Sequence, residues 1–471
     1  MIRGTKCLKS EEFLMPEIKK NTIHPLEIQG YTAEGMGVGR LDGRVVFVPD
    51  TIKGEHWDVQ LLKVNKNVAW GKGKRLLLES RERVPYDCPH AAKCGGCQYR
   101  HMTYQEELRA KKSRVEDALK RLGGVDLELP DVLGAEVPLR YRNKVQFPVG
   151  PGRSEALIGF YRPRSHDIID VDDCLLQPEI ATKLRRLIKQ WMGQCKVAPY
   201  DETTRKGVLR HLYVRTNQKG ESLCCLIING KTLPHGRILI DLLENHLPGL
   251  VGIVVNSNTK DTNVILGDEY YTLWGQDYLE ETLCGLTFRL SVPSFFQVNR
   301  AQTERLYALA LEFAGLTGNE TVLDLYCGIG TISLAMAQKA GKVIGAEIVP
   351  EAIEDAKANA VRNGVSNAEF FCGDAGEVAF KLAQDGVRPQ VVCVDPPRKG
   401  LQADVPGIIT GMSPDRIVYV SCDPATLARD LKRFAELGYQ TAKAQPVDLF
   451  PRTAHVETVA LLTKEKGVCQ Q

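Results

Sequence analysis

The C-terminal part of the chain alternates between short β-branched runs and longer helical runs, and this pattern most constrains the fold. A strand, a crossover helix and the next strand place two strands in parallel, so the alternation from about residue 283 predicts an α/β fold with a doubly wound parallel sheet. The expected strands are 320–325, 342–347, 368–372, 390–394 and 416–421, and the expected helices are 331–340, 350–363 and 424–437.

The preceding residues do not share this alternation. Short alternating runs between Gly-rich turns, such as the turn expected at 34–39, predict a small oligonucleotide-binding type of β-barrel. A cysteine cluster, a helix from about Tyr104 to Leu122 and mixed elements follow, with strands expected at 141–149, 156–171, 208–216, 222–229 and 250–256 and a helix at 178–194. We therefore expect three domains: a barrel at 18–80, a mixed α+β central domain at 81–282 and an α/β domain at 283–471.

Composition gives broader limits. The chain has 471 residues, of which 43% are hydrophobic and 25% charged, as in ordinary soluble proteins. No apolar run has the length or flanks of a membrane span or signal peptide, so we expect a cytoplasmic protein, a monomer without a membrane partner. The formal net charge of +3 says little, but residues 63–83 hold seven Lys or Arg against two Glu. This run fits either a nucleic-acid contact or a solvated basic face.

Cys422 directly follows the expected strand 416–421, and Pro424 prevents that strand from continuing. The thiol is thus expected at the carboxyl end of a parallel strand, where open α/β sheets bind their ligands.

A glycine-rich loop, Asp324 to Thr331, links a strand to a helix in the same region. Glu347 ends the next strand, nineteen residues after Gly328, at the usual place for a carboxylate that binds a ribose diol. A nucleotide-binding dehydrogenase would share these features. The third glycine of its motif is absent at Ser333, and the acidic Asp324 is typical of S-adenosylmethionine sites.

Two further acidic residues follow strands of this sheet. Asp374 comes after the strand 368–372, where such sheets often contact an adenine ring. Asp395 opens the sequence Asp-Pro-Pro-Arg, which many methyltransferases of nucleic-acid bases place between substrate and methyl group. A role for Asp395 in a turn or helix cap is the plainer alternative.

Four cysteines point to a metal site, because disulfides are rare in reducing compartments. Cys88, Cys94 and Cys97 lie within ten residues, and 76 residues separate Cys97 from Cys174 in Asp-Asp-Cys. This spacing alone fits zinc as well as an iron–sulfur cluster. A radical enzyme is disfavoured, because it needs an iron without a cysteine ligand.

Five motifs in order resemble the RNA 5-methyluridine methyltransferase family over about residues 20–465. They are Ser-Phe-Phe-Gln-Val-Asn (294–299), the loop 324–331, Asp-Pro-Pro-Arg (395–398), Ser-Cys-Asp-Pro (421–424) and His-Val-Glu-Thr-Val (455–459). The resemblance is greatest to the branch that methylates 23S ribosomal RNA and has an N-terminal TRAM barrel and a 4Fe–4S cluster. It implies a Rossmann-like class I methyltransferase domain that uses S-adenosylmethionine.

The resemblance also implies residue roles. Cys422 would be the nucleophile and Glu457 the base, and formation of the thiolate would need a pKa lowered by nearby cations or hydrogen-bond donors. The implied contacts to S-adenosylmethionine are Gln297, Tyr326, Glu347 and Asp395, joined by Asp374 from its strand position, while Thr331 departs from the Asn of some relatives. The implied cluster ligands are Cys88, Cys94, Cys97 and Cys174, and we interpret Cys327, Cys372 and Cys393 as core thiols.

RNA is the expected partner, and 23S rRNA is favoured over tRNA. Candidate contacts are the barrel with its basic run and the segment Arg140, Arg142 and Lys144, interleaved with Tyr141 and Phe147. Solvated charges remain the alternative for this segment. A non-catalytic RNA-binding or assembly factor is the rival function, although it would need neither Cys422 nor Glu457.

Overall fold

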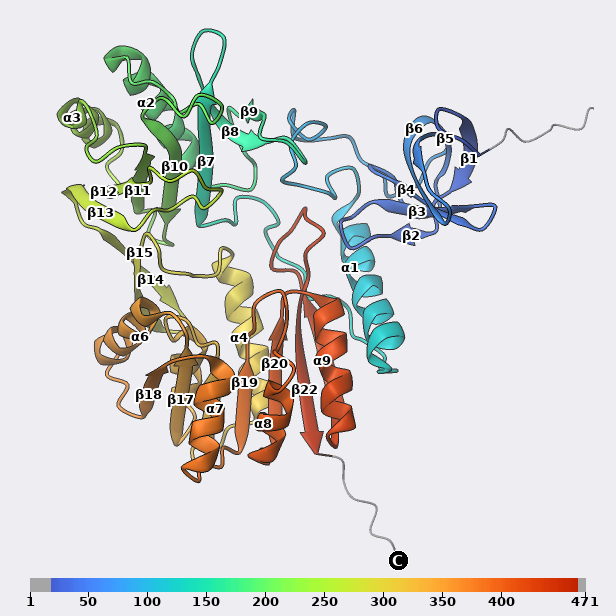
Figure 1. Ribbon diagram of the computed structural model, residues 1–471. Coiled ribbons are helices and arrows are strands. Elements are labelled where there is room, and N and C mark those ends of the chain that lie inside the picture. The colour runs from blue at the N-terminus through green and yellow to red at the C-terminus, as the bar shows by residue number, and fades with distance from the viewer. Residues whose placement is uncertain (1–17, 465–471) are drawn as a thin grey trace, which may run out of the picture. The chain divides into compact units, whose positions relative to one another are not determined.

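The computed structural model describes residues 18–464 (Figure 1). These residues form two compact units. The first unit holds the described residues up to Tyr86 together with Gln98–Ala110, and the second holds Asp87–Cys97 and the residues from Lys111 onward. The predicted boundaries at 80/81 and 282/283 stay predictions. Within the described range, no helix has the length and apolar character that crossing a membrane requires.

The first unit is built on a six-stranded curled sheet in the order β1-β5-β6-β4-β3-β2. Its edge strands β1 and β2 are separated in the chain by two residues only, so one bent strand borders both sides of the sheet. This closure is consistent with a TRAM-like barrel. The strands are β1 (Ile23–Glu27), β2 (Gly30–Tyr31), β3 (Gly37–Leu41), β4 (Arg44–Val48), β5 (His56–Val64) and β6 (Val68–Leu78).

The expected glycine-rich turn at 34–39 is shorter than predicted, because β3 already begins at Gly37. A Cβ atom at Gly39 would lie 2.5 Å from the carbonyl oxygen of Glu27. This glycine therefore allows two backbones to approach inside the barrel and does not serve a turn.

Helix α1 (Tyr104–Ala118) continues into a π-helical turn, η1 (Leu119–Gly123). Gly124 ends it with a left-handed φ of 67°, as the Gly-Gly pair predicted.

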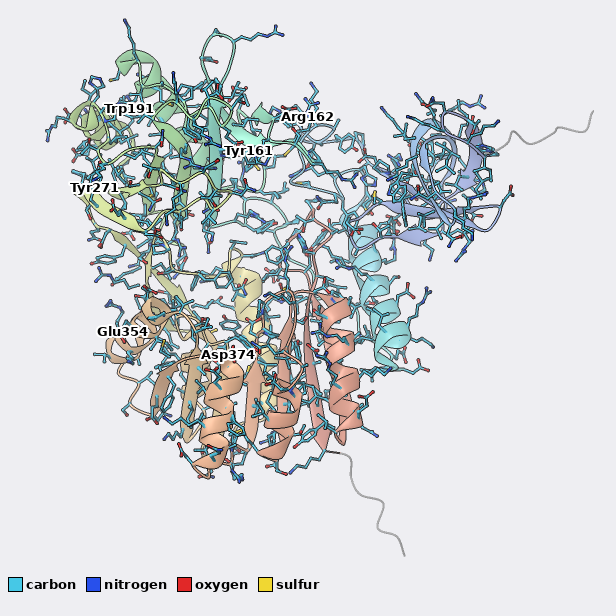
Figure 2. The ribbon with its side chains drawn as sticks, viewed as in Figure 1. Tyr161, Arg162, Trp191, Tyr271, Glu354 and Asp374 are labelled. Carbon is cyan, nitrogen blue, oxygen red and sulfur yellow. The ribbon has the colours of Figure 1, made fainter. Side chains whose placement is uncertain are left out.

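The second unit contains a seven-stranded sheet in the order β13-β12-β11-β10-β7-β8-β9. Its expected strands and helix are confirmed, except that the expected strand 156–171 divides into β8 and β9, and α3 and β13 to β15 were not predicted. Trp191 of α2, labelled in Figure 2, belongs to the core between the helices and one face of this sheet. The elements are β7 (Lys144–Pro151), β8 (Ala156–Tyr161), β9 (Ile168–Asp170), α2 (Glu179–Cys195), β10 (Leu209–Thr216), β11 (Ser222–Ile228), α3 (Gly236–His246), β12 (Leu250–Ser257), β13 (Glu269–Gly275) and the hairpin β14 (Tyr278–Leu283) and β15 (Leu286–Ser291).

A second seven-stranded sheet, in the order β18-β17-β16-β19-β20-β22-β21, follows in the chain (Figure 1). The five predicted strands are parallel, as expected, while β22 and β21 add an antiparallel edge that was not predicted. The elements are α4 (Arg300–Ala314), β16 (Thr321–Leu325), α5 (Thr331–Ala337), β17 (Lys342–Glu347), α6 (Pro350–Arg362), β18 (Ala368–Cys372), α7 (Ala375–Gln384), β19 (Val391–Val394), α8 (Val405–Gly411), β20 (Arg416–Ser421), α9 (Pro424–Glu436), β21 (Tyr439–Val447) and β22 (Glu457–Lys464).

Alternate strand residues supply two cores on the two faces of this sheet. Val322 packs with α4, α5 and α6, whereas its neighbour Leu323 packs with α7, α8 and α9. The strand order reverses between β16 and β19, which are adjacent although β17 and β18 lie between them in the chain. Helices connected to opposite faces separate at such a point, and ligands bind there beyond the carboxyl ends of the strands.

Candidate active site

Cys422 and Glu457 lie at neighbouring strand ends. Cys422 directly follows β20, and the antiparallel pairing of β20 with β22 places Ser421 opposite Thr458. The next position in that register brings Glu457 beside Cys422. Glu457 is only 3% exposed, and Cys422 is partly buried. The pairing thus joins two residues that the motifs place 35 positions apart in the chain.

Asp395 joins this pair from the adjacent strand, because it follows β19 and β19 pairs with β20. Desolvation of its carboxyl group raises the pKa of Asp395 to about 7. Burial, followed by the charge of Asp395, raises the pKa of Glu457 to about 8, against an opposing effect of Arg398. The strand ends therefore gather carboxyl groups that hold protons near neutral pH.

The Cys422 thiol departs from the sequence-based expectation of a lowered pKa. Burial is the main cause that raises its pKa to about 12, and the charges of Glu457 and Asp395 add to it. The positive charge of Arg398 opposes this shift. The expectation was wrong for the protein alone, because it counted on cations and neglected burial beside two carboxylates.

Arg398 and His455 are site residues to which the sequence patterns gave no role. The Nη2 atom of Arg398 lies 3.5 Å from Nε2 of His455. Burial and then Arg398 lower the pKa of His455 to about 4, so the imidazole is neutral at physiological pH. The Asp-Pro-Pro-Arg motif was itself a signal for Arg398, whereas its approach to His455 depends on the fold.

His455 lies in the segment between β21 and β22, and Glu457 follows as the first residue of β22. Buried contacts hold this segment in place. Nζ of Lys111 lies 2.6 Å from Oδ1 of Asp448, and both side chains are fully buried. Nη1 of Arg114 donates to the carbonyl oxygen of Ala454 over 2.6 Å, and Nδ2 of Asn299 donates to that of Leu449 over 3.0 Å. Residues of α1 and of the α4 N-terminus therefore hold the segment that leads to Glu457.

The glycine-rich loop lies at the end of β16 in a conformation that few residues adopt. Tyr326, Gly328 and Gly330 have φ angles of 70°, 54° and 82°. Glu347, at the end of β17, accepts hydrogen bonds from the backbone N–H groups of Gly328 (3.2 Å) and Val349 (3.1 Å). The predicted carboxylate therefore does lie beside the loop.

The acidic residue at the start of this loop is buried without full compensation. The Ser333 hydroxyl donates to Oδ2 of Asp324, which explains a serine at the third glycine position, while Oδ1 of Asp324 is buried with no partner. Burial raises the pKa of Asp324 to about 7. The glycine conformations and the orphaned oxygen fit a cationic nucleoside ligand at this loop.

The remaining predicted cofactor residues have structural partners of their own. Asp374, labelled in Figure 2, caps α7 by accepting from the N–H of Gly376 over 2.9 Å, and its Oδ2 accepts from Nε2 of Gln402 over 2.9 Å. The backbone oxygen of Gln297 accepts from Nδ2 of Asn143 over 2.9 Å. Thr331 is hydrogen-bonded to the Tyr307 hydroxyl over 2.7 Å.

The cysteines expected in the core divide into two kinds. Cys327 and Cys393 are buried, as expected. Cys372 is exposed, so that expectation was wrong; it ends β18, the edge strand of the sheet.

The four candidate metal ligands are each partly buried. Burial raises the pKa of Cys174, and the nearby Cys94 and Cys88 raise it further, so these three sulfur atoms share one region. In the range 18–464, no three or more His, Cys, Asp or Glu side chains take up a metal-binding arrangement. Four cysteine thiols are suitable ligands for an iron–sulfur cluster, but these side chains do not take up the arrangement of a metal site in residues 18–464.

Arg140, one of the predicted RNA contacts, has partners within the chain. Its guanidinium pairs with Asp173 and donates to the carbonyl oxygens of Cys174 (2.9 Å) and Gln177 (3.0 Å). In the barrel, Arg83 of the basic run pairs with the buried Glu55, and Arg75 pairs with Asp58. Lys72 and Lys74 remain exposed on β6.

The sheet order, the glycine loop after β16 and the acidic end of β17 define the class I methyltransferase fold. The family model described as tRNA (Uracil-5-)-methyltransferase matches residues 103–465. The chain belongs to this family, that of the S-adenosylmethionine-dependent RNA uracil-5-methyltransferases.

Individual relatives agree with the family model. An uncharacterized RNA methyltransferase of Clostridium tetani is 48% identical over 447 residues, which cover 95% of this chain and 97% of the relative. Another of Clostridium acetobutylicum is 47% identical, covering 95% of this chain and 98% of the relative. The crystal structure of Pyrococcus abyssi tRNA (uracil-54, C5)-methyltransferase in complex with S-adenosyl-L-homocysteine is 25% identical, with a TM-score of 0.75, and covers 94% of this chain and 100% of that one.

Proposed function

We propose that this protein forms 5-methyluridine in RNA through a covalent bond between Cys422 and carbon 6 of the uracil ring, with Glu457 as the base. The observation that carries this proposal is the placement of a thiol and a buried carboxyl group at the ends of the paired strands β20 and β22. A non-catalytic RNA-binding factor has no need of this pair.

The chemistry explains why a thiol and a carboxylate must be neighbours. Carbon 5 of uracil is a weak nucleophile, and addition of a thiolate to carbon 6 makes it an enolate carbon. S-adenosylmethionine supplies the electrophilic methyl group. Glu457 then removes the proton from carbon 5, the ring double bond reforms and the Cys422 thiolate leaves.

The pKa values in the site suit these proton transfers. A carboxyl group with a pKa near 8, as at Glu457, is a stronger base than an ordinary glutamate and works close to neutral pH. Cys422 must lose its proton before it attacks, and Arg398 is the cation that favours its thiolate. These pKa shifts support a division of roles between a base on β22 and a cation on the loop after β19.

We propose that S-adenosylmethionine lies against the glycine loop and the acidic strand ends. Glu347 is the candidate for its ribose hydroxyls, and Asp395, Tyr326, Gln297 and Asp374 are candidates for its remaining groups. The loop conformation and the buried acidic groups support this, because the sulfonium and ammonium groups of the cofactor are cations.

The test is methyl transfer from isotope-labelled S-adenosylmethionine to uridine-containing RNA, with the product digested to nucleosides. Cys422→Ala should give no labelled 5-methyluridine, whereas Cys372→Ala, the matched change at an exposed cysteine, should keep wild-type activity. Equal activity of wild type and Cys422→Ala would overturn the proposed mechanism.

For the substrate, we propose uridine in 23S rRNA, with tRNA as the second candidate. The TRAM-like barrel and the four cysteines support the rRNA branch, and the Pyrococcus abyssi tRNA (uracil-54, C5)-methyltransferase supports tRNA. Mapping 5-methyluridine in both RNAs from a deletion strain, with and without the restored gene, decides between them.

We further propose that Cys88, Cys94, Cys97 and Cys174 hold a 4Fe–4S cluster with a structural role. Four thiolates would fill every iron position of such a cluster. Anaerobically purified protein should be brown, with about four iron and four sulfide per chain. A colourless protein that contains zinc would contradict this.

A further inference from the structure

Three cationic side chains gather on one face of the sheet that contains β7 and β10. Lys144 of β7 pairs directly with Arg215 of β10. Arg142 lies two residues before β7, near enough that its charge lowers the pKa of Lys144. We call Arg142, Lys144 and Arg215 the cationic triad. The helix-covered core, with Val145 and Val214, is on the opposite face.

The triad has no internal counter-charge. Across residues 18–464, none of the three side chains forms an ion pair with a carboxylate, and Nε of Arg142 and Nη1 of Arg215 are buried without a hydrogen-bond partner. Arg215 is only 1% exposed. Burial, followed by the charges of Arg215 and Arg142, lowers the pKa of Lys144 to about 8. Such a cluster is costly unless an anion joins it.

Two other arginines in this part of the fold have carboxylate partners. Arg140 pairs with Asp173, and the buried Arg185 lies 3.0 Å from Asp170 and 2.8 Å from Asp172. The cationic triad differs from these two arginines, because none of its three side chains has a carboxylate partner in the described part of the chain.

The triad adjoins two segments of the proposed active site. Nη2 of Arg215 donates to the carbonyl oxygen of Ser294 over 2.6 Å, at the start of the segment that contains Gln297. Arg142 is among the cations that lower the pKa of His455, which lies beside Arg398. An anion held by the triad would therefore lie next to the proposed position of the uracil ring.

We propose that the cationic triad binds a phosphodiester group of the RNA strand next to the target uridine. This inference rests on the proposed function and deepens it by assigning the backbone contact. S-adenosylmethionine carries a net positive charge and is repelled by three cations, whereas every nucleotide of RNA brings one phosphate. Holding that phosphate would fix the strand while the uracil is turned out of its stack.

The test measures binding of a fluorescein-labelled, single-stranded oligouridine RNA to the full-length protein at several salt concentrations. All proteins carry Cys422→Ala, so no covalent step contributes. Arg142→Gln and Lys144→Met should each weaken binding about tenfold and lower the slope of log affinity against log salt by about 0.7, the value for one phosphate contact of a single strand. Lys183→Met, at an exposed position of α2, is the control and should change neither value.

A pH series adds a readout that a merely structural role would not give. Because the pKa of Lys144 is about 8 without RNA, affinity should fall between pH 7 and pH 9 as this side chain loses its proton. Lys144→Arg should keep the affinity at pH 7 and remove that fall. Unchanged salt slopes in both Arg142→Gln and Lys144→Met would overturn the proposal.

Binding of S-adenosylmethionine shows whether the anion at the triad is an RNA phosphate or the carboxylate of the cofactor. S-adenosylmethionine affinity should be the same in wild type and Lys144→Met, and its loss in proportion to RNA binding would assign the triad to the carboxylate of the cofactor and overturn the proposal. Altered salt slopes, together with no methylation by the protein that retains Cys422, would refute the proposed reaction and leave the phosphate site standing. Normal methylation by the protein that retains Cys422, with unaltered salt slopes, would support the proposed reaction and overturn the phosphate site.

Discussion

The carboxyl ends of β16, β19 and β20 and the face of β7 and β10 differ in the sign of their buried charge. Asp324, Asp395 and Glu457 gather at the strand ends, where burial raises their pKa values to about 7, 7 and 8. On the other sheet, burial lowers the pKa of Lys144 to about 8 beside Arg142 and Arg215. One cause, the removal of water, thus shifts acids upward and a base downward.

The contrast matches the two substrates of an RNA methyltransferase. The acidic strand ends suit a cationic methyl donor, and the basic sheet face suits a polyanion. Neither region neutralises its charges internally, so each sacrifices stability for a ligand of opposite charge. Variants of the two regions can break or sharpen this contrast, from the largest expected effect to the smallest.

Substitutions at the strand ends should reduce turnover more than substitutions in the triad. Glu457→Gln should lower turnover about 1,000-fold, because proton removal by a positioned base contributes factors of that order. Methyl transfer should still occur once, so a covalent protein–RNA complex should accumulate on ordinary uridine RNA and be visible on denaturing gels. Lys144→Met should instead raise the KM for RNA with little change in kcat. Wild-type turnover in Glu457→Gln would remove that residue from the mechanism.

The reactivity of Cys422 should report the charges around it. Glu457→Gln should speed alkylation of Cys422 by iodoacetamide, and Arg398→Gln should slow it, each about tenfold at pH 8, because a shift of one pKa unit changes the thiolate fraction tenfold. Peptide mass spectrometry measures both rates, with the exposed Cys372 as the internal control. Identical rates in the two variants would contradict the electrostatic account.

The effect of a variant on thermal stability should depend on pH in opposite directions for the two regions. A raised carboxyl pKa costs the folded state nothing below the unfolded pKa of about 4.3 and most above pH 8, so Glu457→Gln should raise Tm by about 3 °C or more at pH 8.5 and by little at pH 5. The depressed pKa of Lys144 destabilises the folded protein fully below pH 8, and this destabilisation disappears as the pH rises towards the unfolded lysine pKa of about 10.4. Lys144→Met should therefore stabilise at pH 6 and less at pH 10. Parallel pH profiles for the two variants would break the comparison.

Exposed cations should matter less than the buried triad. Replacement of Lys72 and Lys74 of the barrel by Glu should weaken RNA binding about threefold at physiological salt and less at high salt, because solvated charges are screened. S-adenosylmethionine binding should not change. A loss as large as that of Arg142→Gln would place the barrel on a par with the triad.

Patterns local in the sequence predicted the elements, and pairing between distant segments decided the rest. The β-branched run before Cys422 was enough to place this thiol at the end of a parallel strand. The antiparallel edge of β21 and β22 was missed, because nothing near Glu457 in sequence shows which strand it joins. The capping pair Asp374 and Glu377 was an available signal for α7 that the expectation of a ligand contact at Asp374 obscured.

Electrostatic roles were the least predictable from sequence. Arg140, Arg142 and Lys144 form one basic run, yet only the fold shows that Arg140 has Asp173 as its partner and that Lys144 faces Arg215. The thiol pKa of Cys422 was misjudged for the same reason, since burial and the approach of Asp395 depend on strand order. Residue type showed which groups carry charge, but not which charges are compensated.

The central claim is that Cys422 attacks carbon 6 of a uridine while the acidic strand ends hold the methyl donor. It is tested most directly by incubating the protein with S-adenosylmethionine and RNA that carries 5-fluorouridine, which cannot lose its carbon 5 substituent after addition. Mass spectrometry should find a methylated fluorouridine on the peptide with Cys422 in wild type and Cys372→Ala, and no adduct in Cys422→Ala. An adduct on another cysteine, or none in wild type on RNA that it methylates in its uridine form, would contradict the account.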